Sequence, residues 1–234
     1  MTEKIRILVL LSNPWSTGRI LVVEEAREIS DRIQEGPYRD KFEMHTHGAV
    51  RPRDLQRLLL KYEPQIVHFS GHSSKGQKIL LDGANGRGRA LDQQGLKDTF
   101  ALHNNHVRLV LLNACFTKPQ ARVISDVVDY SIGTAGLIGD KASVAFAGAF
   151  YRALAFGMSI RDAFRSARAE LALTKMARSR GIELFVRNQI DKNDRFPQEA
   201  FQYPTKTPSG RARVKTIVRV TTVRTVQQTI YVRG

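Results

Sequence analysis

The sequence predicts an α/β fold in which helices cover both faces of a mostly parallel β-sheet. Two observations lead to this prediction. Short apolar runs recur along residues 5–186, and between most of them apolar residues are spaced three or four positions apart, as on one face of a helix. Strands that alternate with helices form parallel sheets, because each helix carries the chain back across the sheet.

The first half of the chain contains three predicted strands and two predicted helices. Residues 5–11 form a continuous apolar run that ends at Ser-Asn-Pro, which is typical of a strand buried on both faces. The apolar residues of 22–33 have helical spacing, and Gly-Pro follows them. Residues 42–47 predict a second strand, residues 55–62 a helix that stops before a proline, and residues 65–69 a third strand.

The second half continues the alternation. Its strands are short apolar runs, and its helices repeat apolar residues at helical spacing. In chain order these elements are a Gly-rich hairpin over 75–90, a helix over 93–102, a strand over 107–112, a weaker strand over 129–133, helices over 142–154 and 160–171, and a strand over 183–186. Ser159 and Asp162 have the spacing of a capping box at the start of the last helix.

The charge of the chain is uneven. Its 37 Lys and Arg against 22 Asp and Glu give a net charge of +15, which favours anionic partners. Residues 200–234 contain seven basic side chains and no Asp or Glu. This composition predicts two parts, a domain over residues 1–195 and a basic, β-prone extension over residues 196–234. The extension is either a solvated tail or a segment that docks an acidic protein or nucleic acid, and the sequence leaves both open.

Composition excludes several classes of protein. No apolar run reaches the roughly 20 residues of a membrane helix, so we expect no membrane insertion. The N-terminus carries Glu3 and only a short apolar run, unlike a secretory signal. The single cysteine, Cys115, allows no internal disulfide. For these two reasons we expect a cytoplasmic protein. His45 and His47 share a strand face without further ligands, so we expect no metal site, and the sequence indicates no cofactor.

Two residues with base and nucleophile chemistry follow predicted strands. His72 comes after the strand at 65–69, and Cys115 comes after the strand at 107–112. Ligands of open α/β sheets bind beyond the carboxyl ends of the strands, and parallel neighbours would bring both residues to one edge. A lone cysteine is usually a small buried residue. An adjacent imidazole, however, would activate a thiol that is otherwise only a few per cent thiolate at neutral pH, which favours a His72–Cys115 dyad.

The segments around these residues resemble the CHAT-domain proteases, which are caspase-like cysteine peptidases. The resemblance rests on Ile66–His72 and Leu111–Cys115, and the separation of His and Cys is close to the roughly 50 residues typical of caspases. Similar segments at 7–14, 132–134, 140–154 and 157–164 extend it from about Ile5 to Leu173. The resemblance implies a three-layer, caspase-like (caspase–hemoglobinase) sandwich and a cysteine endopeptidase that cuts a protein substrate.

The resemblance also implies roles for individual residues. Cys115 corresponds to the nucleophile and His72 to the general base that later protonates the leaving amine. The backbone N–H groups of Cys115 and Ser73 would hold the oxyanion. Many relatives have glycine in place of Ser73, so the loop fits serine only if it does not require a positive φ. The Gln-Ala-Cys string of caspases is absent, since Asn113 precedes Ala114 and Cys115, and specificity for Asp is not implied.

Other polar residues have competing interpretations. Asp140 precedes a predicted helix, where it is either an N-cap or, as in several caspase-like peptidases, a carboxylate at the floor of the specificity pocket that selects a basic side chain. His68 lies within a strand and is expected to face the core or a helix. His103 and His106 flank Asn-Asn and predict a solvated turn.

Three functions are consistent with these features to different degrees. The leading hypothesis is a cysteine endopeptidase, by resemblance a regulated prokaryotic effector of antiviral defence or cell death, controlled by a separately encoded regulatory or sensor protein, by oligomerisation or by the extension. The alternative is a catalytically idle interaction module that docks an acidic protein or nucleic acid through its basic extension. A nucleotide-processing domain would need a catalytic Glu or a phosphate loop, and Gly83–Gly88 lacks the spacing of such a loop.

Overall fold

The computed structural model describes residues 4–17, 20–74, 76–83, 85–174, 181–188, 190, 194 and 196–197. In this part of the chain a six-stranded sheet has the order β2-β1-β3-β6-β7-β8, and β8 alone runs antiparallel to its neighbour. The strands are β1 (Ile5–Ser12), β2 (Phe42–His47), β3 (Ile66–Gly71), β6 (Leu109–Asn113), β7 (Tyr130–Thr134) and β8 (Ile182–Val186). The predicted, mostly parallel α/β sheet is confirmed.

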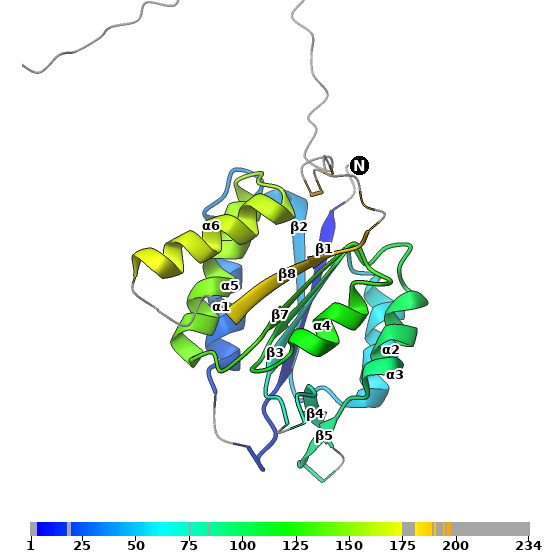
Figure 1. The fold of residues 1–234 in the computed structure, drawn as a ribbon. Coiled ribbons are helices and arrows are strands. Elements are labelled where there is room, and N and C mark those ends of the chain that lie inside the picture. The colour runs from blue at the N-terminus through cyan, green and yellow to red at the C-terminus, as the bar shows by residue number, and fades with distance from the viewer. Residues whose placement is uncertain are drawn as a thin grey trace, which may run out of the picture. The chain divides into compact units, whose positions relative to one another are not determined.

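Helices cover both faces of this sheet (Figure 1). One face carries α1 (Val22–Gln34), α5 (Asp140–Ala155) and α6 (Ile160–Leu173); the other carries α2 (Pro52–Tyr62), α3 (Gln93–Ala101) and α4 (Lys118–Ile124). A short 3₁₀ helix, η1 (Arg39–Lys41), precedes β2. The three layers of the predicted sandwich are therefore present. No described helix is both long and apolar enough to cross a bilayer.

Two apolar cores fill the spaces between the layers. Successive side chains of a strand point to opposite faces, so the continuous apolar run of β1 supplies both cores. Its Ile7 and Val9 pack with α1, α5 and α6, whereas Leu8 and Leu10 pack with α2 and α3. This arrangement explains why the strands lack the alternation of polar and apolar residues that marks a sheet with one solvated face.

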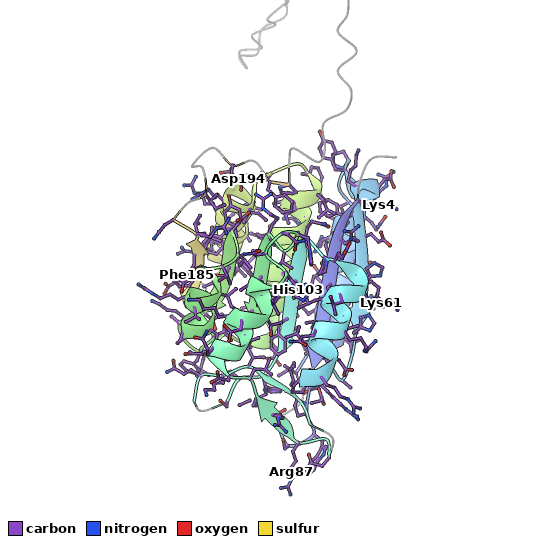
Figure 2. The ribbon with its side chains drawn as sticks, turned by 90° about the vertical axis from the view of Figure 1, so that its right-hand side faces the viewer. Lys4, Lys61, Arg87, His103, Phe185 and Asp194 are labelled. Atoms are coloured by element: carbon purple, nitrogen blue, oxygen red, sulfur yellow. The ribbon has the colours of Figure 1, made fainter. Side chains whose placement is uncertain are left out.

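A small hairpin projects from the edge of the sheet at which the parallel strands end. It consists of β4 (Leu80–Asp82) and β5 (Gly88–Ala90), which pair antiparallel as the Gly-rich stretch predicted. Figure 2 shows Arg87 at the tip of this hairpin, at the opposite end of the domain from Lys4, which precedes β1. The hairpin therefore marks the carboxyl edge of the sheet.

The structure tests two predictions at helix ends, the turn after α3 and the cap of α6. The turn predicted between His103 and His106 is present, and its Asn104 and Asn105 are exposed, but His103 itself is only 6% exposed and is therefore buried. His103 follows the buried Phe100 by three residues, and the turns after α3 continue its helical direction, so His103 stays on the inner face of the helix. The cap predicted for α6 is confirmed, since the hydroxyl oxygen of Ser159 accepts a hydrogen bond from the backbone N–H of Asp162. The predicted extension over 196–234 lies, apart from residues 196 and 197, outside the described residues.

Candidate active site

His72 and Cys115 extend from the tips of two neighbouring strands. β3 and β6 pair in parallel with Ser70 opposite Asn113, and each of the two candidate residues lies two positions beyond that pair. Both line a cavity of about 500 Å³ at the carboxyl edge of the sheet. The structure thus brings together two residues that are 43 positions apart in the sequence.

The same cavity contains the other two predicted site residues, Ser73 and Asp140. Much of its remaining wall is apolar and comes from the start of α1 and from the loop before α5, including Leu21, Leu137 and Ile138. Leu21 and Leu137 are exposed at the rim. The cavity therefore combines polar groups with an apolar lining, as sites for organic ligands and peptide side chains commonly do.

A glycine fixes the chain immediately before His72. A Cβ atom on Gly71 would lie 2.7 Å from the carbonyl oxygen of Ser12 and 2.7 Å from Cζ of Phe69. Because Ser12 is opposite Gly71 in the β1–β3 pairing, the two backbones approach more closely than any larger residue allows. This close approach holds His72 against the edge of the sheet.

The chain turns sharply immediately after Cys115. Phe116 has a φ of 55°, a left-handed conformation that is strained for a bulky residue, and its N–H donates to the carbonyl oxygen of Gly136 at 3.2 Å. Such strain clusters at functional sites, where the surrounding structure holds it in place. Cys115 itself is half-buried, and its Sγ lies 3.6 Å from the carbonyl oxygen of Ile138.

Two threonines orient the peptide group between Ala114 and Cys115. The carbonyl oxygen of Ala114 accepts hydrogen bonds from the hydroxyl of Thr117 at 3.1 Å and from the hydroxyl of Thr134 at 2.5 Å. In a trans peptide the N–H points away from the carbonyl oxygen. The two hydroxyls therefore fix the direction of the Cys115 N–H, which is one of the predicted oxyanion donors.

The second predicted donor belongs to the peptide group between His72 and Ser73. Its carbonyl oxygen accepts the N–H of Leu80 at 2.9 Å, so the hairpin fixes the direction of the Ser73 N–H. Ser73 does not have a positive φ, and serine therefore fits where relatives have glycine. Within the described part of the chain, neither the Ser73 nor the Cys115 N–H donates to a protein acceptor.

Asp140 is the first residue of α5 and lies exposed at the cavity. Its interpretation as an N-cap is wrong, because Gly139 occupies that position with an extended backbone (ψ 147°) and Asp140 already has helical conformation. The N-cap interpretation places the cap one residue too late. Asp140 is therefore available to other partners in the cavity.

A buried carboxylate that lines the same cavity was not predicted from the sequence. Glu25 is 3% exposed, and its Oε1 lies 2.6 Å from Nε2 of His68, whose predicted contact with a helix is confirmed. Its Oε2 accepts the hydroxyl of Ser70 at 2.8 Å, and Oε1 accepts Nδ2 of Asn113 at 2.6 Å. Three donors from β3 and β6 thus converge on one side chain of α1.

The sequence does carry a weak signal for this residue. Glu25 follows Val22 by three positions and precedes Ile29 by four, so it lies on the apolar face of α1. A carboxylate on that face requires buried partners, because an unpaired buried charge is very costly. The partners themselves cannot be read from the helix.

Comparisons with known proteins show the family of this chain. A family model described as CHAT domain matches residues 14–204. The chain is 27% identical over 177 residues to a Roc-COR-CHAT protease from an unknown prokaryotic organism, covering 73% of this chain and 17% of that protein. It is 24% identical over 150 residues to a probable protease of Gillisia limnaea, covering 63% of this chain and 26% of that protein. The chain therefore spans about a quarter or less of the length of these curated relatives.

Among solved structures, the fold is similar to that of the Arg specific cysteine proteinase gingipain R. The TM-score is 0.55, the sequence identity is 8%, and the match covers 77% of this chain and 46% of that chain. At this identity the likeness concerns the fold alone.

Proposed function

This chain belongs to the CHAT domain family, and from that premise we propose that it is a cysteine endopeptidase that cuts a protein partner with a His72–Cys115 dyad. The observation that carries the proposal is the shared cavity, which both side chains line from the tips of adjacent strands. The names of the two curated relatives, both proteases, support the same reaction class.

The proposed reaction needs only groups that line the cavity. The imidazole of His72 takes the proton from Sγ of Cys115, and the thiolate attacks the substrate carbonyl carbon, forming a C–S bond. The N–H groups of Ser73 and Cys115 stabilise the resulting oxyanion. His72 then donates its proton to the amine as the C–N bond breaks. Water, deprotonated by His72, attacks the thioester, the C–S bond breaks, and the protonated imidazole returns its proton to the sulfur.

We assign Asp140 to substrate selection within this proposal. Its carboxylate lies exposed at the cavity, where a cationic side chain of the substrate would find a partner. We expect the wild-type protein to prefer Lys or Arg before the cut bond. Asp140→Asn should reduce this preference, measured as a ratio of kcat/KM values, by about tenfold. An apolar preference unchanged by the substitution would assign selection to the Leu21 and Leu137 rim instead.

The biological role is also part of the proposal. By its family resemblance, the chain acts as a regulated prokaryotic effector of defence or cell death, and a separately encoded sensor or regulatory protein switches it on. Expression in bacteria tests this role: the wild-type chain together with its activator should slow growth, and Cys115→Ala should not. Growth inhibition by both the wild-type chain and Cys115→Ala would mean that the effect does not depend on proteolysis, and would contradict the proposed role.

Profiling with a peptide library tests the chemistry directly. Cleavage by the purified chain should be abolished by Cys115→Ala, and His72→Ala should lower kcat/KM by at least about 1,000-fold. His45→Ala is the matched control, because His45 stacks on Tyr62 at 4.2 Å, away from the cavity, and should cleave normally. Cleavage that survives Cys115→Ala would refute the proposed function.

An anionic partner for the extension over 196–234 stays a prediction. If the extension binds nucleic acid, the affinity of the chain should fall steeply with salt concentration, and this dependence should disappear when the residues after Pro208 are removed.

A further inference from the structure

One carboxylate joins both strands that carry the proposed dyad. Glu25 contacts β3 through His68 and Ser70, and it contacts β6 through Asn113. Ser70 and Asn113 are directly opposite each other in the sheet. The side chain of Glu25 therefore bridges the two strands at the last residue pair before their tips.

The stability of the core does not account for this carboxylate. Glu25 is 3% exposed, and removing a carboxylate from water is expensive even when its partners are good. Packed apolar side chains of similar volume often stabilise a protein as well as a buried polar cluster does, or better. A neighbouring position, Glu24, carries an exposed carboxylate on the same helical turn without this cost. The buried position of Glu25 indicates a role in the geometry of the site.

Tyr151 and Asn113 extend this cluster beyond Glu25. Burial raises the pKa of Tyr151 well above its ordinary value, so its hydroxyl keeps its proton and can donate to Nδ1 of His68, 3.2 Å away. In the tautomer that accepts from Tyr151, Nε2 of His68 carries the proton and donates to Oε1 of Glu25. Asn113 uses its amide group to reach both Glu25 and the carbonyl oxygen of Ser143, at 3.1 Å, which extends the cluster to α5.

The path from this cluster to the dyad is short and stiff. One residue separates Ser70 from His72, namely Gly71, which packs against the backbone of β1. One residue, Ala114, likewise separates Asn113 from Cys115, and two threonine hydroxyls hold its carbonyl group. A change in the separation of the strand tips would therefore pass directly to the imidazole and the thiol.

We propose that Glu25 is a positioning residue that sets the distance between His72 and Cys115. This inference rests on the proposed function, since it concerns the same two side chains. Positioning and direct electrostatics make opposite predictions. A nearby negative charge disfavours a thiolate, so its removal alone would make Cys115 more reactive, whereas the loss of positioning would make it less reactive.

The test measures alkylation of the chain's single cysteine by iodoacetamide between pH 5 and pH 10. The variant Glu25→Gln keeps the shape of the side chain but replaces charge-assisted hydrogen bonds with weaker neutral ones. We expect its alkylation rate at pH 7 to fall by about tenfold. We expect kcat for a cleaved peptide to fall similarly, with KM within about twofold of the wild-type value. Glu24→Gln, which removes the same charge from the same turn, should behave as wild type in both assays.

Several outcomes would overturn the inference. Alkylation at the wild-type rate or faster would exclude positioning, and an increase in KM with unchanged alkylation would assign Glu25 to substrate binding. If thermal unfolding shows that Glu25→Gln does not fold, two smaller changes decide. Asn113→Ala removes the hydrogen bond between Glu25 and β6. Ser70→Ala removes one contact of Glu25 with β3 but leaves the contact with His68. We therefore expect Asn113→Ala to slow alkylation more than Ser70→Ala does. An equal or reversed effect would refute the proposal.

The wild-type profile keeps this inference separate from the proposed function. If Cys115 titrates in the wild-type protein like a free thiol, with a pKa of about 8.5, the dyad itself is wrong. If the wild-type thiol is activated and Glu25→Gln leaves it unchanged, the dyad stands and only the role of Glu25 fails.

Discussion

Replacing Gly71 with alanine tests how the sheet holds the proposed base. The added Cβ would lie 2.7 Å from the carbonyl oxygen of Ser12, which is backbone and cannot rotate away. Ordinary contact begins near 3.4 Å, so β1 and β3 must separate locally by about 0.7 Å. Overpacking of this kind costs about 1–3 kcal/mol, which for a domain of about 200 residues lowers the melting temperature by about 2–12 °C.

The same displacement reaches His72, the next residue. A shift of about 1 Å in a catalytic group can cost up to about 100-fold in rate, so we expect kcat/KM of Gly71→Ala to fall by about tenfold or more. Gly48→Ala is the control, because a Cβ there meets nothing within 4 Å and should change neither property. Calorimetry and peptide cleavage measure the two effects. A Gly71→Ala protein with wild-type melting temperature and activity would refute the close-approach argument.

Three further predictions concern the hairpin, the buried histidine and the oxyanion donor. Gly86 has a φ of 75°, so Gly86→Ala should lower the unfolding free energy by about 1–2 kcal/mol. The added Cβ would also lie 2.2 Å from the Trp15 ring, so acrylamide should quench the single tryptophan more strongly in this variant. Burial lowers the pKa of His103 below its ordinary 6.5, so the unfolded chain binds that proton more tightly. The contribution of His103 to stability is therefore present above pH 6.5 and is lost as the pH falls below it. Urea unfolding at pH 7.5 and pH 5 should show that His103→Asn loses less unfolding free energy between the two pH values than the wild-type protein does. Thr134→Val removes one hydrogen bond to the Ala114 carbonyl and should lower kcat severalfold at unchanged KM, whereas an unchanged kcat would mean that Thr117 alone orients the peptide.

The fold was predictable because the four central strands of its sheet, β1, β3, β6 and β7, are buried on both faces. Continuous apolar runs such as β1 are a strong local signal, and the alternation with helices fixes the parallel order of much of the sheet. The helix α4 (Lys118–Ile124) was not predicted, because its seven residues complete only two turns and show no clear period. The cap of α5 was placed one residue too late, at Asp140 instead of Gly139, because a cap depends on the backbone conformation of Gly139, which composition does not reveal.

The candidate site was predictable to the extent that it depends on strand ends. His72 and Cys115 each follow an apolar run, and sheet topology then brings them together without further information. Glu25 depends instead on partners 43, 45 and 88 residues away, and nothing in α1 specifies them. Sequence patterns report the period of one element, whereas a buried polar cluster requires the packing of several elements at once.

Glu25 and Thr134 control different aspects of the proposed site, and two assays can separate them. Thr134 orients the Cys115 N–H, which matters only when an oxyanion forms. Alkylation by iodoacetamide displaces iodide and forms no oxyanion, so Thr134→Val should slow peptide cleavage but leave the alkylation rate unchanged. Glu25→Gln acts on the distance between thiol and imidazole and should slow both reactions. Both variants remove buried hydrogen bonds, so each could also loosen the fold in general. In that case Thr134→Val would slow alkylation as well as peptide cleavage, as Glu25→Gln does, and the two variants would no longer differ.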